Sequence, residues 1–345
     1  MRAFTTSLAA ALIGLAGLFG LAALGLAGLG AAAQAETIKI GVLKVSACGP
    51  IMIALEKGYF AKEGLTAEPV FFDSPILIPQ GIMSGDLDFG LAANSAGFFN
   101  TANQGAMRII AADGDESPGF KGLLVAVSNQ AYAGGLKSLK DFGGHSFAIT
   151  AAGTLQQYDL GVLAAKYGFD YRSLRMMPTG SFPNMVAALV SGGADTGIPP
   201  LSVSRSAIGG DKLHNLAWIS DEMRMQIAVV MTGAKTADNK PDLVERFLRV
   251  YLAGTRDYHD AFTGPDERPH DGPTADATYA IIAKYTDVPV AAMKLGLVHL
   301  DAQGRLNVAD VMHQIEWYKA QGMVKPEVDG EKIIDKRYVV PLPGT

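Results

Sequence analysis

Small and polar residues follow several of the apolar runs that predict strands, and they could hold a ligand. They are Ser46, Cys48 and Gly49 after the first run, Asn94 and Ser95 after the third, Gly153 and Thr154 after the run at 145–150, and Pro199–Ser202 after a later run. At a helix start, free N–H groups and the helix dipole attract an anion without Lys or Arg. Each position alone also fits an ordinary helix cap. Four of them together predict a small-anion site.

The residue types that usually carry catalysis or bind metals are scattered. The six histidines show no paired spacing, and the chain has no G-x-S-x-G elbow, P-loop or G-x-G-x-x-G motif. The single cysteine, Cys48, excludes a disulfide scaffold and a thiolate-rich metal site. We therefore expect no catalytic residue, no cofactor and no metal. The alternative to a binding protein is a protein of another class, a periplasmic enzyme or a sensor domain.

The composition and net charge of the chain limit the classes of partner that it can bind. Of 345 residues, 49% are hydrophobic and 18% are charged, so the chain is too apolar for a disordered protein. The formal net charge is −5 and there is no basic run. A nucleic-acid partner is therefore not expected, because such binding needs a broad positive surface.

The first 35 residues have the pattern of a cleaved signal peptide. Arg2 precedes a long run of Leu, Ala and Gly, which ends at Ala33-Gln34-Ala35. The run is long enough to span a bilayer, so an uncleaved anchor is the alternative. A lipoprotein signal ending at Cys48 is disfavoured, because Glu36 and two lysines intervene. The sequence predicts export to the periplasm after cleavage behind Ala35.

The rest of the chain alternates predicted strands and helices. Strands are expected at 37–44, 67–73, 88–93, 108–112 and 122–127, with helices between them, and a second series begins at 145. Such alternation predicts a parallel α/β sheet. Loop signals near 128–135 and 223–234 suggest two crossings between lobes. We expect lobe 1 at 36–130 and 232–345, lobe 2 at 131–231, and a ligand in the cleft between them.

Three segments resemble a known family. Ala54–Leu65 (ALEKGYFAKEGL) after an I-x-I-G strand, Ser84–Gly90 (SGDLDFG) and Ala187–Asp195 (AALVSGGAD) are similar to the periplasmic substrate-binding proteins of nitrate/sulfonate/taurine-type ABC importers. The same superfamily includes the thiamine-precursor binders. The resemblance implies a type II periplasmic-binding-protein fold that captures a small solute. It also implies delivery to an inner-membrane ABC permease with its ATPase, by a protein that we expect to be a monomer.

The resemblance also implies roles for particular residues. Family members bind through the loop at Ser46–Gly49, the turn at Asn94 and Ser95, and the helix start at Gly153 and Thr154. Lys44 stands where sulfonate binders often carry a lysine. Tyr158 lies in the first turns of the helix after Thr154 and could stack on an aromatic ring. We expect a sulfonate or an aromatic or aliphatic carboxylate as ligand, with a thiamine-like pyrimidine as the alternative.

Overall fold

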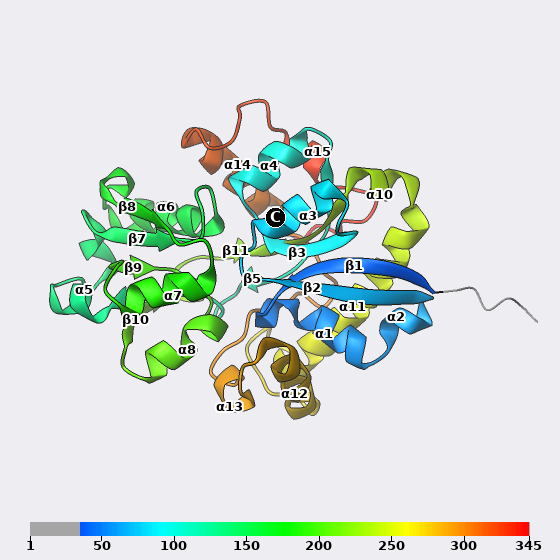
Figure 1. Cartoon of the computed structure of the whole chain (residues 1–345), viewed down its shortest axis with the longest axis horizontal. Helices are drawn as coiled ribbons and strands as arrows, with labels where there is room; N and C mark the ends of the chain where they lie inside the picture. The colour runs from blue at the N-terminus through cyan, green and yellow to red at the C-terminus, as the bar shows by residue number, and fades with distance from the viewer. Residues whose placement is uncertain (1–34, 345) are drawn as a thin grey trace, which may run out of the picture. The chain divides into compact units, whose positions relative to one another are not determined.

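Two five-stranded sheets organise the part of the chain that the computed structural model describes, residues 35–344 (Figure 1). The strands of the first sheet, in spatial order, are β2 (Leu65–Phe72), β1 (Glu36–Leu43), β3 (Phe89–Ala93), β12 (Ala228–Gly233) and β4 (Met107–Ala112). Those of the second are β10 (Leu213–Trp218), β6 (Leu124–Ser128), β9 (Thr196–Gly197), β7 (Ser146–Ile149) and β8 (Arg175–Pro178). The predicted α/β fold class with two sheets is confirmed.

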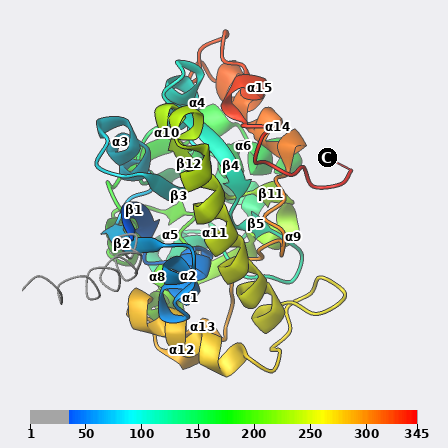
Figure 2. The same cartoon turned by 90° about the vertical axis from the view of Figure 1, so that its right-hand side faces the viewer.

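Helices cover both sheets. In chain order they are α1 (Gly49–Glu56), α2 (Tyr59–Lys62), α3 (Leu77–Ser84), α4 (Ala96–Asn103), α5 (Asn129–Ala133), α6 (Leu155–Tyr167), α7 (Phe182–Val190), α8 (Leu201–Gly209), α9 (Ile219–Glu222), α10 (Ala234–Asn239), α11 (Pro241–Phe262), α12 (Ala275–Thr286), α13 (Val290–Met293), α14 (Val308–Ala320) and α15 (Gly330–Ile333). The long helix α11 runs beside α1 and α2 (Figure 2). The helical segment between β1 and β2 is divided into α1 and α2, because Gly58 adopts a left-handed conformation with φ +68°.

The sheets are mixed, whereas the sequence predicts parallel ones. β1 runs parallel to β2 and β3, but β12 runs antiparallel to both of its neighbours, β3 and β4. β12 is the strand on which the chain returns from the second sheet to the first. The direction of β12 depends on that long return path. The sequence does not reveal it, because a buried strand has the same β-branched, apolar composition in either direction.

Two short strands connect the sheets. β5 (Asp115–Glu116) and β11 (Met225–Gln226) pair antiparallel and lie between the two sheets (Figure 1). The Gln226 side chain bridges this junction: its amide nitrogen donates to the carbonyls of Asp113, Gly114 and Ala228 at 2.8–3.2 Å. Its amide oxygen accepts from the Asn307 N–H at 3.1 Å. We propose that this pair of strands is the hinge between two lobes.

The first lobe boundary differs from the sequence prediction. Strand β6 pairs with β10 and β9 in the second sheet, so Leu124–Ser128 does not belong to lobe 1 as expected. We propose that lobe 2 spans residues 117–224, and that the rest of the described chain forms lobe 1. The sequence of an apolar run of strand length does not predict which sheet the strand joins, because either sheet buries it equally well.

A close helix contact holds lobe 1 together. A Cβ atom on Gly254 of α11 would lie 2.2 Å from the carbonyl oxygen of Pro50 in α1, so only glycine permits this approach. One turn before Gly254, Tyr251 is fully buried, and Phe247 stacks on Phe89 of β3 with ring centroids 3.8 Å apart. These contacts fix α1, and with it the loop after β1.

The predicted signal segment, residues 1–35, lies almost wholly outside the described residues. No helix within residues 35–344 is both long and apolar enough to cross a membrane.

Candidate ligand-binding site

A cavity of about 60 Å³ lies between the two proposed lobes. Lobe 1 contributes the loop after β1, the end of β3, Asp113 after β4 and the start of β12. Lobe 2 contributes Leu123, the first turns of α6, the start of α7 and Pro200 with Ser202. Most of the wall is apolar, so the few polar groups on it are conspicuous. Apolar walls with a few placed polar groups are typical of small-molecule sites.

Asp159 of α6 is the most unusual of these polar groups. Its side chain is fully buried on the cavity wall, and neither carboxylate oxygen has a hydrogen-bond partner within the described chain. Burial raises the pKa of this carboxyl well above its ordinary value, and the nearby Asp310 carboxylate raises it further. Leaving a buried carboxyl without partners is costly. A ligand that donates hydrogen bonds or carries positive charge would remove that cost.

Asp113 is the second carboxyl on the wall. It is 2% exposed, and its Oδ1 accepts a hydrogen bond from the Tyr251 hydroxyl at 3.0 Å. Burial raises the pKa of Asp113 to about 7, although the bond from Tyr251 opposes the change. The same hydroxyl lies 2.8 Å from the carbonyl oxygen of Ala112. Helix α11 therefore fixes the orientation of this cavity carboxyl.

The ionisable side chains on the cavity wall are acidic. Among the described residues that line it, Asp113 and Asp159 are acidic and none is Lys, Arg or His. Glu116, also fully buried, lies close enough for the Asp159 carboxylate to raise its pKa after the larger effect of burial. A ligand bound here meets carboxylates rather than cations.

The residues predicted after β1 lie at or beside this cavity. Ser46 and Cys48 line it, within a single turn of 3-10 helix at Ser46–Cys48, and the buried Gly49 begins α1 directly behind them. The Leu43 N–H donates to the Cys48 sulfur at 3.4 Å, and burial raises the pKa of the thiol, with the Asp113 carboxylate adding to the effect. Cys48 is thus a protonated part of the wall and a poor nucleophile.

The other two predicted segments meet each other. Ser95 and Thr154 form an isolated antiparallel bridge, and the Ala96 N–H donates to the carbonyl of Gly153 at 2.8 Å. The Ser95 hydroxyl accepts from the Phe98 N–H, and the Gly153 N–H donates to the Gln157 side chain. Asn94 lies beside them, fully buried, and its side-chain amide makes no hydrogen bond within the described chain. Two backbone N–H groups of this predicted anion site, those of Ala96 and Gly153, are therefore bonded to the chain itself, whereas the Asn94 side chain has no partner there.

Two predicted residues lie away from the cavity wall. The Lys44 ammonium forms an ion pair with Asp287 at 2.8 Å, and half of its side chain is exposed. The Tyr158 hydroxyl contacts Asp310 at 2.9 Å and His313 Nδ1 at 2.8 Å. Its ring packs edge-on against Trp317 of α14. In this arrangement Tyr158 joins α6 to α14, and no stacking surface for a ligand is formed by its ring.

Sequence reasoning missed Asp159, Asp113 and Phe182, which all line the cavity. One signal for Asp159 was present: it stands four residues after Leu155 and four before Leu163, so it lies on the apolar stripe of a helix. An acidic residue on such a stripe must be buried with a partner or serve a function. For Asp113, which follows an apolar strand, no comparable pattern exists.

The Asp113 carboxyl predicts a pH dependence of stability. Since its pKa is about 7 in the folded chain and near 3.8 unfolded, the folded state holds a proton that the unfolded state loses. Its contribution to the free energy of unfolding therefore falls between about pH 4 and pH 7, by at most about 4 kcal/mol, and is constant above that range. Denaturant unfolding of wild type and Asp113→Asn across pH 4–8 measures the contribution as a difference. A difference that does not change with pH would contradict this assignment.

Two sheets joined by a paired hinge around a buried cavity define the class: this is the fold of the periplasmic binding proteins. Solved structures agree. The Candida albicans CA3427 product, described as having the generic periplasmic binding protein fold, matches with a TM-score of 0.68 at 15% identity, over 90% of this chain and 99% of that one. The alkanesulfonate-binding protein SsuA from Xanthomonas axonopodis pv. citri, bound to MOPS, matches with a TM-score of 0.71 at 15% identity, over 87% of this chain and 98% of that one. The nitrate-binding protein NrtA from Synechocystis PCC 6803 matches with a TM-score of 0.69 at 12% identity, over 88% of this chain and 87% of that one.

Within that class, the chain belongs to the NMT1/THI5-like family, whose model matches residues 46–267. No sequence match was found among curated proteins. The matched range begins in the loop after β1 and ends in the loop after α11, so it contains the cavity residues except Leu43, Val45 and Val298. The resemblance noted from the sequence is confirmed.

Proposed function

We propose that this protein is the extracytoplasmic solute-binding component of an ABC importer. It captures a small solute in the cavity between its lobes and delivers it to a membrane permease with its ATPase. The observation that carries the proposal is the buried Asp159 carboxyl, which has no partner within the described chain and faces a cavity formed by both lobes. Closing two lobes over a solute would satisfy this group. The closed conformation that results would be the form that the permease recognises.

We propose further that the solute carries N–H donors, as a small amine or an aminopyrimidine does. The sequence favours an organic anion, with the pyrimidine as alternative. The cavity supports the alternative, because its charged groups are Asp113 and Asp159. An anion placed there would meet no Lys or Arg among the described lining residues, and it would be repelled by either carboxyl in its ionised form.

Binding without turnover fits the chemistry of the wall. A thiol or hydroxyl nucleophile would have to be Cys48 or one of the two serines on the wall, Ser46 and Ser202, and burial keeps the Cys48 thiol protonated. No histidine among the described residues lines the cavity to act as a base for either group. The two carboxyls are therefore proposed to bind the solute and not to transform it. We also propose that the exported protein acts in the periplasm as a monomer.

A thermal-shift screen of the mature protein tests the solute class. The panel contains primary amines and aminopyrimidines on one side, and sulfonates and carboxylates of similar size on the other. A solute at 100 times its Kd should stabilise the protein by about 2.7 kcal/mol. We expect shifts from the first group only, and mass spectrometry should recover the bound compound unchanged. Shifts from the anions alone would contradict the solute class, and a converted compound would contradict the binding role.

A further inference from the structure

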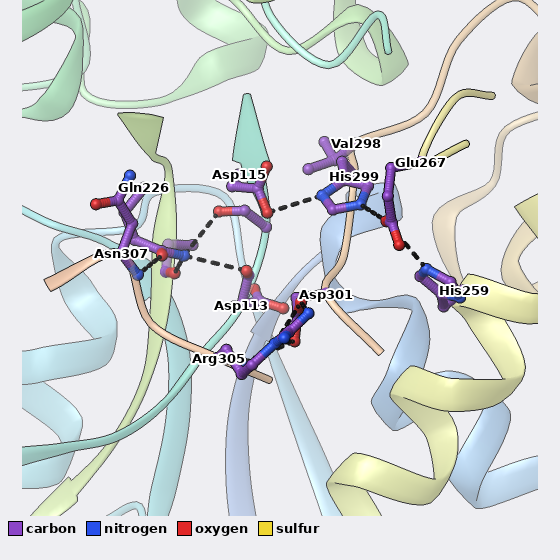
Figure 3. Close-up of polar contacts among 12 residues, drawn as sticks. Asp113, Asp115, Gln226, His259, Glu267, Val298, His299, Asp301, Arg305 and Asn307 are labelled. Atoms are coloured by element: carbon purple, nitrogen blue, oxygen red, sulfur yellow. Dashed lines mark hydrogen bonds and ion pairs between the residues drawn. The ribbon is translucent and has the colours of Figure 1, made fainter. Parts of the chain in front are cut away.

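Three potential metal ligands from distant parts of the chain converge outside the solute cavity. His259 lies in the last turn of α11, Glu267 in the loop between α11 and α12, and His299 in the loop before α14. Their nitrogen and oxygen donors all lie within 4.8 Å of one another. Figure 3 shows Glu267 between the two imidazole rings, with His299 also turned toward Asp115. From the sequence, these histidines have no metal-binding spacing.

The distances within this cluster fit one ion. Glu267 Oε2 lies 3.2 Å from His299 Nε2 and 3.4 Å from His259 Nε2. A tetrahedral zinc ion with bonds of about 2.0–2.1 Å separates neighbouring donor atoms by about 3.3–3.4 Å. The separation of the carboxylate oxygen from each imidazole nitrogen thus matches an edge of such a tetrahedron. Two imidazoles with one carboxylate suit zinc better than magnesium or calcium, which prefer oxygen ligands alone.

A further carboxylate orients one of the rings. Asp115 Oδ2 lies 2.8 Å from Nδ1 of His299, and the Asp115 N–H donates to the carbonyl of His299 at 3.1 Å. With its Nδ1 proton held by Asp115, a neutral His299 presents the Nε2 lone pair to the other side. A carboxylate that bonds the far nitrogen of a metal-binding histidine is a recurrent feature of zinc sites.

The backbone and the surroundings support the same arrangement. Glu267 has φ +58°, an uncommon conformation for a residue other than glycine, and it directs the carboxylate at both histidines. His299 is nearly buried, while the Glu267 side chain is 59% exposed, so an ion could enter from solvent. Beside them is a hollow of about 370 Å³ that leaves room for a fourth ligand, such as water. The nearby Asp301 is already bound by the Arg305 guanidinium through both carboxylate oxygens.

We propose that His259, Glu267 and His299 form a zinc site, with Asp115 as the residue that orients His299. Asp115 belongs to hinge strand β5, so the ion would tie the end of α11 and its following loop to the hinge. The site would stabilise lobe 1 at the hinge. It does not depend on the identity of the solute, because none of its three ligands lines the solute cavity.

Calorimetric titration of untagged, metal-stripped mature protein with zinc chloride tests the site. We expect one zinc ion per chain and a higher melting temperature, which EDTA reverses. His259→Gln and His299→Gln should each weaken zinc binding by more than the roughly 10- to 100-fold loss expected for Asp115→Asn. His270 is an exposed histidine in the same loop as Glu267, and His270→Gln should bind zinc like wild type.

The alternative outcomes are distinct. Unchanged zinc affinity in folded His259→Gln protein would overturn the site, as would equal stabilisation by magnesium chloride. Circular dichroism establishes the fold of each variant; His259 lies at a helix end near the surface, so its variant remains informative if His299→Gln fails to fold. Solute binding measured in the thermal-shift screen should persist in His259→Gln, and this separates the zinc site from the proposed transport role.

Discussion

Asp159→Asn is expected to weaken solute binding by about 100-fold or more and, at the same time, to stabilise the empty protein. Hydrogen bonds to a charged group are worth about 1.5–3 kcal/mol, and removing one partner of a buried ion pair costs about 3–5 kcal/mol. Each 1.4 kcal/mol is about tenfold in Kd. In the empty protein the raised pKa favours protonation of the buried Asp159 on folding near pH 7, a cost that a neutral amide does not carry, so the variant should be more stable by about 1–3 kcal/mol. Opposite effects on binding and stability are typical of a residue retained for function.

Calorimetric titration with the best solute from the screen, combined with urea unfolding of the empty protein, measures both effects. Asp335→Asn is the matched control: Asp335 is also mostly buried, but Arg337 pairs with it at 2.6 Å, away from the cavity. That variant should lose stability and keep its affinity. If Asp159→Asn binds like wild type, or if it is less stable, the carboxyl has a structural partner and the proposed site is wrong.

Gly254→Val is expected to cause the largest loss of stability. The new Cβ would stand 2.2 Å from the carbonyl oxygen of Pro50, which belongs to the backbone of α1 and cannot rotate away. Helices α1 and α11 would have to separate. Overpacking of a core contact costs about 1–3 kcal/mol and more where the backbone must move. Since α1 follows the cavity loop directly, and Tyr251 positions Asp113 one turn away on α11, solute affinity should fall as well.

Gly97→Ala provides the control for Gly254→Val. Gly97 lies on the exposed side of α4, and a Cβ there meets no atom within 4 Å. Alanine at this position should be neutral or stabilise the protein by up to about 1 kcal/mol, because glycine loses more backbone freedom on folding. Urea midpoints of the two variants decide the matter. Equal stabilities would show that α1 and α11 adjust to the extra methyl groups without cost.

The proposed hinge is bonded to the helix that carries Asp159. Gln226 on β11 contacts the carbonyls of Gly114 and Ala228 through its side chain and, through its own N–H, the Asp310 carboxylate at 2.7 Å. Asp310 in turn accepts from Tyr158, on the helix that carries Asp159. A solute that satisfies Asp159 therefore acts on a helix already bonded to the hinge. Rotation about two short strands needs few changes in backbone angles, as in other hinged domains.

Much of the fold was determined by local sequence. The alternation of β-branched runs with amphipathic segments predicted the strands β1–β4 and most helices, because hydrophobic periodicity requires only that one face be buried. The loop after β1 was also predicted at the ligand site, and Ser46 and Cys48 do line the cavity. Carboxyl ends of neighbouring strands meet at one edge of a sheet, so strand order along the chain was enough for that inference.

Tertiary structure alone decided the charge of the site and the grouping of distant residues. Asp113 and Asp159 acquire their raised pKa values from burial, and burial depends on walls supplied by segments up to 255 residues apart along the chain, from Leu43 to Val298. The sheet that β6 joins and the meeting of His259 with His299 likewise follow from long-range packing. The sequence establishes which ionisable and polar side chains the chain contains and how they are spaced. The desolvation and the neighbours that set their chemistry exist only once the two lobes have folded against each other.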